Sequence, residues 1–517
     1  MSTVPRALSS IRRRVVLSAQ IARTPSLIPR CRAYATEATL QDVPKPSTVG
    51  QPTWQSHPHL VEPGDITPGI PAHEYERRRV ELMADLPEGS VVVCFAGQIK
   101  FMSGSIFYKF RQASDFWYLT GFEEPDSAVV LQKDGSQGGF RMILYSTGHD
   151  PSKAIWDGAS TSFLDAQTLF AANDVRPLDE LPVDLKSFIS NASNVYVDTP
   201  ASSSKRKTAT GKSLLRYFAG GRVGRNDPEA LLDGLSATKR KPLAPLVGKL
   251  RSVKSVHEQK VMRAAADISG LAHAKTMRFA SPGLGEADLA AHFEYMCARA
   301  ESQRPAYVPV VASGANALII HYTKNDHLLR DGELVLIDAG CEYSGYASDI
   351  SRTFPVSGTF TPPQRELYTA VLSAQKQLVA LCTESNGFSL NDLHRKSVEM
   401  LRTELKQIGF SFDMDKGVLE RVLYPHYLAH SVGIDLHESV SFDRYAPLKD
   451  GMVVTIEPGI YVPKDSSFPA QFQGIGIRIE DEVLVGKDAP VVLSVAAPKE
   501  VADVEGACQG ALGFEPF

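Results

Sequence analysis

Apolar positions in the first half of the chain fall into short runs with the length and spacing of β-strands. Such runs predict strands at 90–97, 115–122, 126–133 and 141–147. Helix-like pieces lie between several of them. This alternation indicates a first α/β domain.

The second half combines longer amphipathic stretches with short apolar ones. Apolar residues at helical spacing predict helices at 256–280, 281–302, 361–382 and 389–410. Thr361, Pro362 and Gln364 form a capping-box start for the third of these helices. Strands are predicted at 307–314, 333–340, 345–356, 451–462 and 474–486. Without a regular βαβ order, this pattern favours an α+β domain in which helices cover a mainly antiparallel sheet.

The N-terminus has a composition of its own. Residues 1–34 contain seven arginines and no acidic residue, which is typical of a mitochondrial presequence. Tyr34 follows Arg32 and Ala33 in a sequence typical of a matrix-processing site; a disordered basic arm is the alternative. We predict a presequence at 1–34, a flexible lead-in at 35–63, the first domain at 64–235, a linker at 236–254, the second domain at 255–500 and a C-terminal tail at 501–517.

Charge and cysteine content exclude some classes of partner. A formal charge of -4 over 517 residues, with a pI of about 6.4, gives no global attraction to nucleic acid. The basic loops at 202–212 and 238–242 lack interleaved aromatic residues, so we expect them to be solvated. No stretch of 18 or more residues is both apolar and uncharged, and the six cysteines form no CxxC pair. We therefore expect no membrane-spanning helix and reduced thiols.

Four predicted strands of the second half each carry a carboxylate in an apolar run: Asp338, Asp349, Glu457 and Glu480. Turns at Gly340 and Gly345 allow the two aspartates to face each other across a hairpin. A single such acid is usually exposed, or neutralised by an arginine such as Arg478. Four like charges in a core cost several kcal/mol each unless cations compensate them. The pattern therefore indicates a metal centre.

A nitrogen donor is available in the segment 424–438, which contains His426, His430 and His437. It lacks the HExxH zinc pattern, because no acidic residue directly follows His426. Each histidine alone is more often a packed or surface residue, but beside the acids one is a plausible ligand and the others plausible substrate contacts. An oxygen-rich set of this kind favours two divalent ions such as Mn²⁺ over structural zinc.

The order of these motifs resembles the pita-bread metallopeptidases, which include aminopeptidase P, prolidase and methionine aminopeptidase. The resemblance spans 255–495 and is carried by DAG at 338–340, GYASDI at 345–350, HSVG at 430–433, EPGIY at 457–461 and GIRIED at 476–481. Segment 108–131 resembles the N-terminal domain of aminopeptidase P, which methionine aminopeptidases lack. With its leader, the chain resembles the mitochondrial aminopeptidase P-type enzymes, which include intermediate cleaving peptidases and Xaa-Pro aminopeptidases.

The resemblance implies a role for each matching residue. The implied metal ligands are Asp338, Asp349, His430, Glu457 and Glu480, and a hydroxide held between two metal ions would attack the first peptide bond. Glu457 would also carry protons. His321 and His437 would contact the scissile carbonyl or the tetrahedral intermediate, and His426 the substrate backbone. Arg478 and Tyr461 would orient the ligands from behind.

The resemblance leaves the substrate open. The implied activity is removal of one N-terminal residue from peptides, or from imported proteins after presequence cleavage. The alternatives are a proline-specific Xaa-Pro aminopeptidase, a prolidase acting on dipeptides, and an inactive peptide-binding protein. We expect a homo-oligomer, a dimer or tetramer, working in the matrix or at the matrix face of the inner membrane. One hypothesis is that the protein trims its own Tyr34 and then begins at Ala35.

Overall fold

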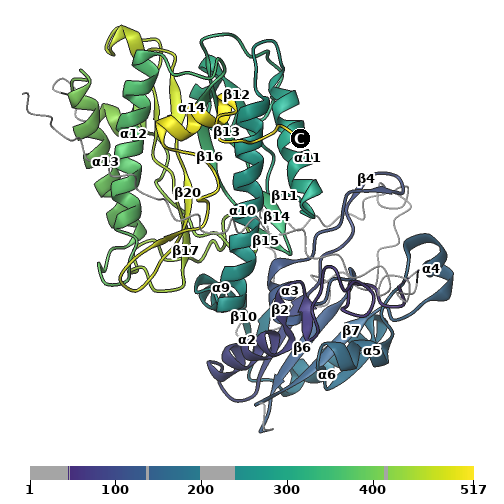
Figure 1. Ribbon diagram of the computed structural model, residues 1–517. Coiled ribbons are helices and arrows are strands. Elements are labelled where there is room, and N and C mark those ends of the chain that lie inside the picture. Colours follow the sequence, from purple (N-terminus) through teal and green to yellow (C-terminus); the bar gives the residue numbers. More distant parts are fainter. Residues whose placement is uncertain (1–44, 46, 136–138, 198–238, 413–416) are drawn as a thin grey trace, which may run out of the picture.

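The computed structural model describes residues 45, 47–135, 139–197, 239–412 and 417–517. The predicted presequence and the basic loop at 202–212 lie outside these residues. Figure 1 shows two lobes, one made of the purple and blue N-terminal elements and a larger one made of the teal, green and yellow elements.

The first lobe is built on a mixed six-stranded sheet, which confirms the predicted α/β architecture. In spatial order its strands are β10 (Arg240–Pro242), β9 (Asn194–Val197), β3 (Ser90–Phe95), β6 (Ala128–Lys133), β7 (Phe140–Ser146) and β8 (Asp174–Pro177). Its helices are α2 (Ala72–Ala84), α3 (Ser114–Thr120), α4 (Pro151–Asp157), α5 (Phe163–Leu169) and α6 (Leu181–Asn191). Two short hairpins lie outside the sheet, β1 (Asp65–Thr67) with β2 (Ile70–Pro71) and β4 (Phe101–Ser103) with β5 (Ile106–Phe107).

The strand predicted at 115–122 is wrong, because most of this segment forms helix α3. Its aromatic residues favour strands in isolation, but Phe116, Trp117 and Leu119 are all buried. A strand would bury only alternate positions on one face, whereas a helix enclosed by neighbouring elements buries them all. Gly121, at a φ of 70°, ends the helix in a left-handed conformation.

Regular structure extends into the predicted linker and tail. Strand β10 lies within the predicted linker, and part of the basic loop at 238–242 is therefore the edge of the first sheet. Helix α9 (Ala244–Ser252) follows it, and helix α14 (Val501–Gln509) lies within the predicted tail and buries Val504 and Ala507 in the core of the second lobe. The predicted domain boundaries themselves stay predictions.

The second lobe confirms the predicted combination of helices and antiparallel strands. Its main helices are α10 (Val256–Phe279), α11 (Glu286–Arg299), α12 (Pro362–Ala380) and α13 (Leu390–Gln407). Its strands are β11 (Arg304–Pro305), β12 (Val310–Ser313), β13 (Leu334–Asp338), β14 (Cys341–Tyr343), β15 (Tyr346–Ala347), β16 (Ser351–Pro355), β17 (Val453–Ile456), β18 (Gly459–Tyr461), β19 (Gly476–Arg478), β20 (Asp481–Leu484) and β21 (Val491–Val492). In Figure 1 the strands run between the α12–α13 pair and the α10–α11 pair.

Two long predicted strands are each broken in the structure. The segment 451–462 divides into β17 and β18 at Glu457 and Pro458, and 474–486 divides into β19 and β20 at Ile479 and Glu480. The halves join different sheets, because β17 pairs with β20 while β18 pairs with β19. Pro458 has no N–H for a continuous ladder. Glu457 and Glu480 therefore lie at the breaks between strands and not within a continuous strand.

Among the described helices, none has the length and hydropathy needed to cross a bilayer. Among the described residues no cysteine forms a disulfide, and the five described cysteines are all buried: Cys94, Cys297, Cys341, Cys382 and Cys508. This agrees with the expected reduced thiols.

Candidate active site

A cavity of about 790 Å³ in the second lobe collects most of the predicted site residues. Its lining includes Asp338, Asp349, Glu457, Glu480, His321, His426, His430, His437 and Arg478. Tyr461 lies behind this wall, where it is buried. We call this cavity the cleft.

Antiparallel pairing brings the two aspartates together, which confirms the predicted hairpin relation. Asp338 ends β13 and pairs with Ser351 at the start of β16, so Asp349 lies just beside it. Tyr307 Oη lies 2.5 Å from Asp338 Oδ1 and 2.6 Å from Asp349 Oδ1. A hydroxyl has one hydrogen and can satisfy only one of these oxygens at a time. Tyr307 alone therefore cannot balance two ionised carboxylates, which need cations beside them as well.

The other three predicted ligands arrive through a second set of pairings. Ile456 pairs with Asp481, which places Glu457 and Glu480 at adjacent strand ends. The backbone N of Thr455 donates to the carbonyl of His430 (2.9 Å), so this histidine lies beside the same strand. One ligand atom each from Asp349, His430 and Glu480 lies within 4.8 Å of the others.

His430 is oriented with one ring nitrogen toward the acids. Its Nδ1 lies 3.2 Å from the Ser431 carbonyl, which fixes Nδ1 as the donor. Its Nε2 lies 3.2 Å from Asp349 Oδ2 and 3.7 Å from Glu457 Oε1. Burial lowers the pKa of His430, but the hydrogen bond and charge of Asp349 and the charge of Glu457 outweigh it and raise the pKa to about 9.

More carboxyl groups are buried at this site than the nearby cations can neutralise if all of them are ionised. Burial, joined by the charges of Asp349 and Asp338 and opposed by His430 and Arg478, raises the pKa of Glu457 to about 8. Burial and the neighbouring carboxylates also hold the pKa of Glu480 well above its usual range. Hard oxygen donors with one imidazole suit divalent ions. The residues present thus fit a divalent metal centre.

A hydrogen-bonded layer behind the acids includes Arg478, Tyr461 and His426. Arg478 donates to Asp338 Oδ2 (2.6 Å), to Tyr461 Oη (2.7 Å) and to Ser351 Oγ (2.9 Å). His426 uses both ring nitrogens, since Nδ1 bonds the Tyr427 carbonyl (2.9 Å) and Nε2 bonds Tyr461 Oη (3.0 Å). Burial and the charge of Arg478 lower the pKa of His426 to about 3, so its ring is neutral. A substrate contact by His426, which stays a prediction, requires one of these bonds to open.

His321 and His437 line the more open part of the cleft. The His437 ring meets the His430 ring edge-on, with centroids 4.3 Å apart. Burial and the charge of His430 lower the pKa of His437, which favours a neutral imidazole. His321 is exposed in a loop that follows β12.

The structure adds site residues that the sequence analysis missed. Tyr307, which bridges the two aspartates, lies at the start of a predicted strand, and no motif marks it.

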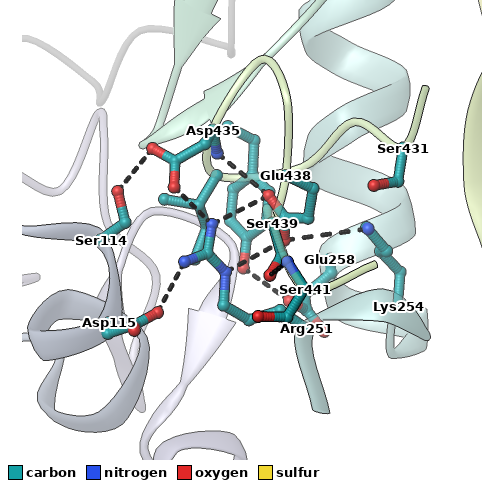
Figure 2. A network of polar contacts seen from close by, with 12 residues as sticks. Ser114, Asp115, Arg251, Lys254, Glu258, Ser431, Asp435, Glu438, Ser439 and Ser441 are labelled. Atoms are coloured by element: carbon teal, nitrogen blue, oxygen red, sulfur yellow. Dashed lines mark hydrogen bonds and ion pairs between the residues drawn. The ribbon is translucent and has the colours of Figure 1, made fainter. Parts of the chain in front are cut away.

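Arg251 is a second residue that the sequence analysis missed, and Figure 2 shows its contacts. It is buried and donates to Asp115 Oδ1 (2.6 Å), to Asp435 Oδ2 (2.6 Å) and to Glu438 through both Nε (3.1 Å) and a terminal nitrogen (3.0 Å).

This network ties the first lobe to the loop between His430 and His437. Asp115 lies in α3, whereas Asp435 and Glu438 lie in the loop 431–438, and Ser114 Oγ also donates to Asp435 Oδ1 (2.6 Å). Lys254 Nζ lies 3.8 Å from Glu438 Oε1. The position of His437 therefore depends on contacts from both lobes.

Comparison with known proteins agrees with this geometry. Residues 260–487 match metallopeptidase family M24, and residues 75–196 match the aminopeptidase P N-terminal domain. Intermediate cleaving peptidase 55 of Saccharomyces cerevisiae is 38% identical over 475 residues, which are 90% of this chain and 90% of that protein. Xaa-Pro aminopeptidase 3 of Homo sapiens is 36% identical over 477 residues, 90% of this chain and 91% of that protein.

Solved structures agree equally well. The crystal structure of Icp55 from Saccharomyces cerevisiae has a TM-score of 0.75 at 36% identity and covers 86% of this chain and 99% of that chain. Aminopeptidase P from E. coli with the inhibitor Pro-Leu has a TM-score of 0.75 at 32% identity and covers 86% of this chain and 100% of that chain.

Proposed function

Because this chain belongs to metallopeptidase family M24 and is a metal-dependent aminopeptidase of the aminopeptidase P type, we propose that it removes one N-terminal residue from imported mitochondrial proteins after presequence cleavage. The observation that carries the chemistry is the convergence of Asp349, His430 and Glu480, with Asp338 and Glu457 beside them, in one buried cleft. The substrate rests on relatives named intermediate cleaving peptidase 55, one of which is described as mitochondrial.

Asp338, Asp349, His430, Glu457 and Glu480 would hold two divalent ions, of which Mn²⁺ is our candidate. Such ions lower the pKa of a bound water and stabilise negative charge on a carbonyl oxygen. Arg478 keeps Asp338 in place through a 2.6 Å hydrogen bond, and Tyr307 does the same for the aspartate pair.

Protein groups then handle protons and the substrate carbonyl. Glu457 accepts a proton from the attacking water and delivers it to the leaving amine. His321 and His437 present N–H groups from the open part of the cleft toward the carbonyl oxygen of the first peptide bond.

Peptide digestion tests the proposal. Purified protein without residues 1–34 is given Tyr-Ala-led and Xaa-Pro-led peptides, with Mn²⁺ or with a chelator, and products are identified by mass spectrometry. We expect metal-dependent loss of one residue, faster from the Tyr-led peptide, and no loss with His430→Ala. Absence of any cleavage by the metal-loaded protein would contradict the proposal.

A proline-specific Xaa-Pro aminopeptidase is the second candidate, because the relatives at 36–37% identity include proteins named Xaa-Pro aminopeptidase 3. Cleavage of only the Xaa-Pro-led peptides would favour it, and cleavage of only dipeptides would favour a prolidase. The inactive peptide-binding alternative is set aside, since the chain belongs to a metallopeptidase family. The five proposed ligands all line the cleft, which supports the same choice.

The proposed location of the protein is the matrix or the matrix face of the inner membrane. The proposed assembly is a homo-oligomer, and sedimentation velocity would test it.

Self-trimming at Tyr34 is tested by a separate experiment. In cells whose sole copy carries His430→Ala, the mature N-terminus should begin at Tyr34; a start at Ala35 would refute self-trimming.

A further inference from the structure

One buried carboxylate holds the loop that carries His321. This loop, residues 313–328, runs from the end of β12 toward β13. Glu286, the first residue of α11, reaches into it and has an exposed fraction of 0%. Neither the metal centre nor the network around Arg251 includes this glutamate.

Five hydrogen bonds connect Glu286 to the beginning, middle and end of the loop. Its Oε1 accepts from Ser313 N (2.8 Å), Ser313 Oγ (2.7 Å) and Asn316 Nδ2 (2.9 Å). Its Oε2 accepts from Tyr322 Oη (2.8 Å) and His327 N (3.0 Å). The contacts enclose His321, because Asn316 precedes it and Tyr322 follows it directly.

All five of these donors are neutral groups. Glu286, Asp326 and His327 could together offer three metal ligands, but the last two are exposed and both oxygens of Glu286 are already engaged by the loop. The carboxylate also lies in the first turn of α11, where the helix dipole favours negative charge. The arrangement therefore suits an ionised carboxylate that organises a loop.

We propose that Glu286 is a positioning residue for the aminopeptidase reaction: it fixes the loop 313–328 so that His321 faces the cleft beside His437. The inference rests on the proposed substrate contact of His321. It assigns to Glu286 no contact with substrate or metal. Its effect on catalysis passes entirely through His321.

Glutamine cannot replace this glutamate in either amide orientation. Hydroxyl donors can rotate and accept from a new N–H, but the backbone N–H groups of Ser313 and His327 cannot. Each oxygen of Glu286 accepts from one of these two N–H groups. An amide NH₂ would therefore always face a backbone donor and push one end of the loop away.

A double-mutant cycle with His321 tests this proposal. We expect Glu286→Gln to lower kcat/KM about tenfold to a hundredfold in the parent protein, as small misplacements of a catalytic group do. On a His321→Ala background the same change should lower kcat/KM by less than about twofold. If Glu286 acts through His321, its substitution has little left to disturb once His321 is absent, whereas independent effects of the two substitutions would add. An equal loss in both backgrounds would overturn the proposal.

Matched variants separate positioning from loss of fold. Asp288→Asn removes a carboxylate from the same helix turn, where it caps Gly285 N (2.7 Å), and should leave kcat/KM within about twofold. Tyr322→Phe removes one donor to Glu286 and provides a milder test if Glu286→Gln does not fold. It should give a smaller loss that also disappears with His321→Ala; a loss that persists there overturns the proposal.

Hydrogen exchange adds a readout independent of activity. In Glu286→Gln, peptides from 313–328 should exchange faster, while those from α12 stay unchanged; equal protection of the loop in both proteins would refute its anchoring. If the parent protein cleaves no peptide, the proposed function fails, whereas cleavage without coupling to His321 overturns only the role of Glu286.

Discussion

Replacing Arg251 by methionine should leave three carboxylates without their shared cation. The Arg251 side chain is 5% exposed, and its guanidinium donates to Asp115, Asp435 and Glu438. Removing one partner of a buried ion pair costs about 3–5 kcal/mol. Part of that cost is offset here, because Asp435 is 34% exposed and still has an ion pair with Arg111, at 3.2 Å. We therefore expect Arg251→Met to lower the free energy of unfolding by about 3 kcal/mol, the lower limit of that range.

Asp115→Asn provides the matched comparison. Arg251 then keeps its bonds to Asp435 and Glu438, and burial, which raises the pKa of Asp115, makes the loss of this charge less costly. We expect Asp115→Asn to cost about 1 kcal/mol or less. The difference between the two variants measures the effect of unpaired acids in the loop 431–438.

Urea unfolding followed by tryptophan fluorescence measures both changes. Trp117 is buried in α3 beside this network, whereas Trp54 is 46% and Trp156 86% exposed, so Trp117 should dominate the signal change. A loss of less than about 0.5 kcal/mol in Arg251→Met, the range of ordinary surface changes, would refute the reasoning. So would an equal loss in Asp115→Asn.

Three further predictions concern the loop, the metal and acid stability. A Cβ at Gly433 would lie 2.5 Å from the Glu438 carboxylate and would displace the loop 431–438, which carries His437. Gly433→Ala should therefore lower kcat/KM about tenfold or more while the circular dichroism spectrum stays unchanged. Unchanged activity would contradict this prediction. Chelation should lower the melting temperature in calorimetry, since the buried Glu457 and Glu480 then lack the cations that favour their ionised forms. Mn²⁺ at about 100 times its Kd should restore about 2.7 kcal/mol; identical curves would refute a metal centre. Hydrogen bonds from Ser389 lower the pKa of Asp392 from 3.8 to about 2, so its stabilising effect is present above 3.8 and lost as the pH falls toward 2. The urea midpoints of the parent and Asp392→Asn should therefore converge over that range, and a constant difference would exclude the effect.

Local patterns in the sequence were sufficient for most of the element types and for a proposal of the chemistry in the cleft. Helical spacing and end signals predicted α10 to α13 within a few residues, because capping and apolar periodicity act over a few positions. The acids were recognisable because a carboxylate in an apolar run is costly and so unusual. Their order along the chain, with His430, carried the resemblance to the metallopeptidases. The structure then places these residues in one cleft, as expected.

Tertiary contacts decided what these local patterns could not. Helix α3 replaced a predicted strand because neighbouring elements bury it on all sides. Two strands broke at Glu457 and Glu480 because their halves gain partners in different sheets.

The sequence by itself determined which residues we propose as the metal ligands and substrate contacts of a metalloaminopeptidase. Only the tertiary structure decided which residues hold them in place: Tyr307, Arg251 and Glu286. The partners of these three residues lie far from them along the chain. Arg251, for example, donates a hydrogen bond to Glu438, which is 187 residues away in the sequence. A hydroxyl or a buried charge has no periodic signature, and its partners are selected by the free energy of the whole fold rather than by neighbouring residues.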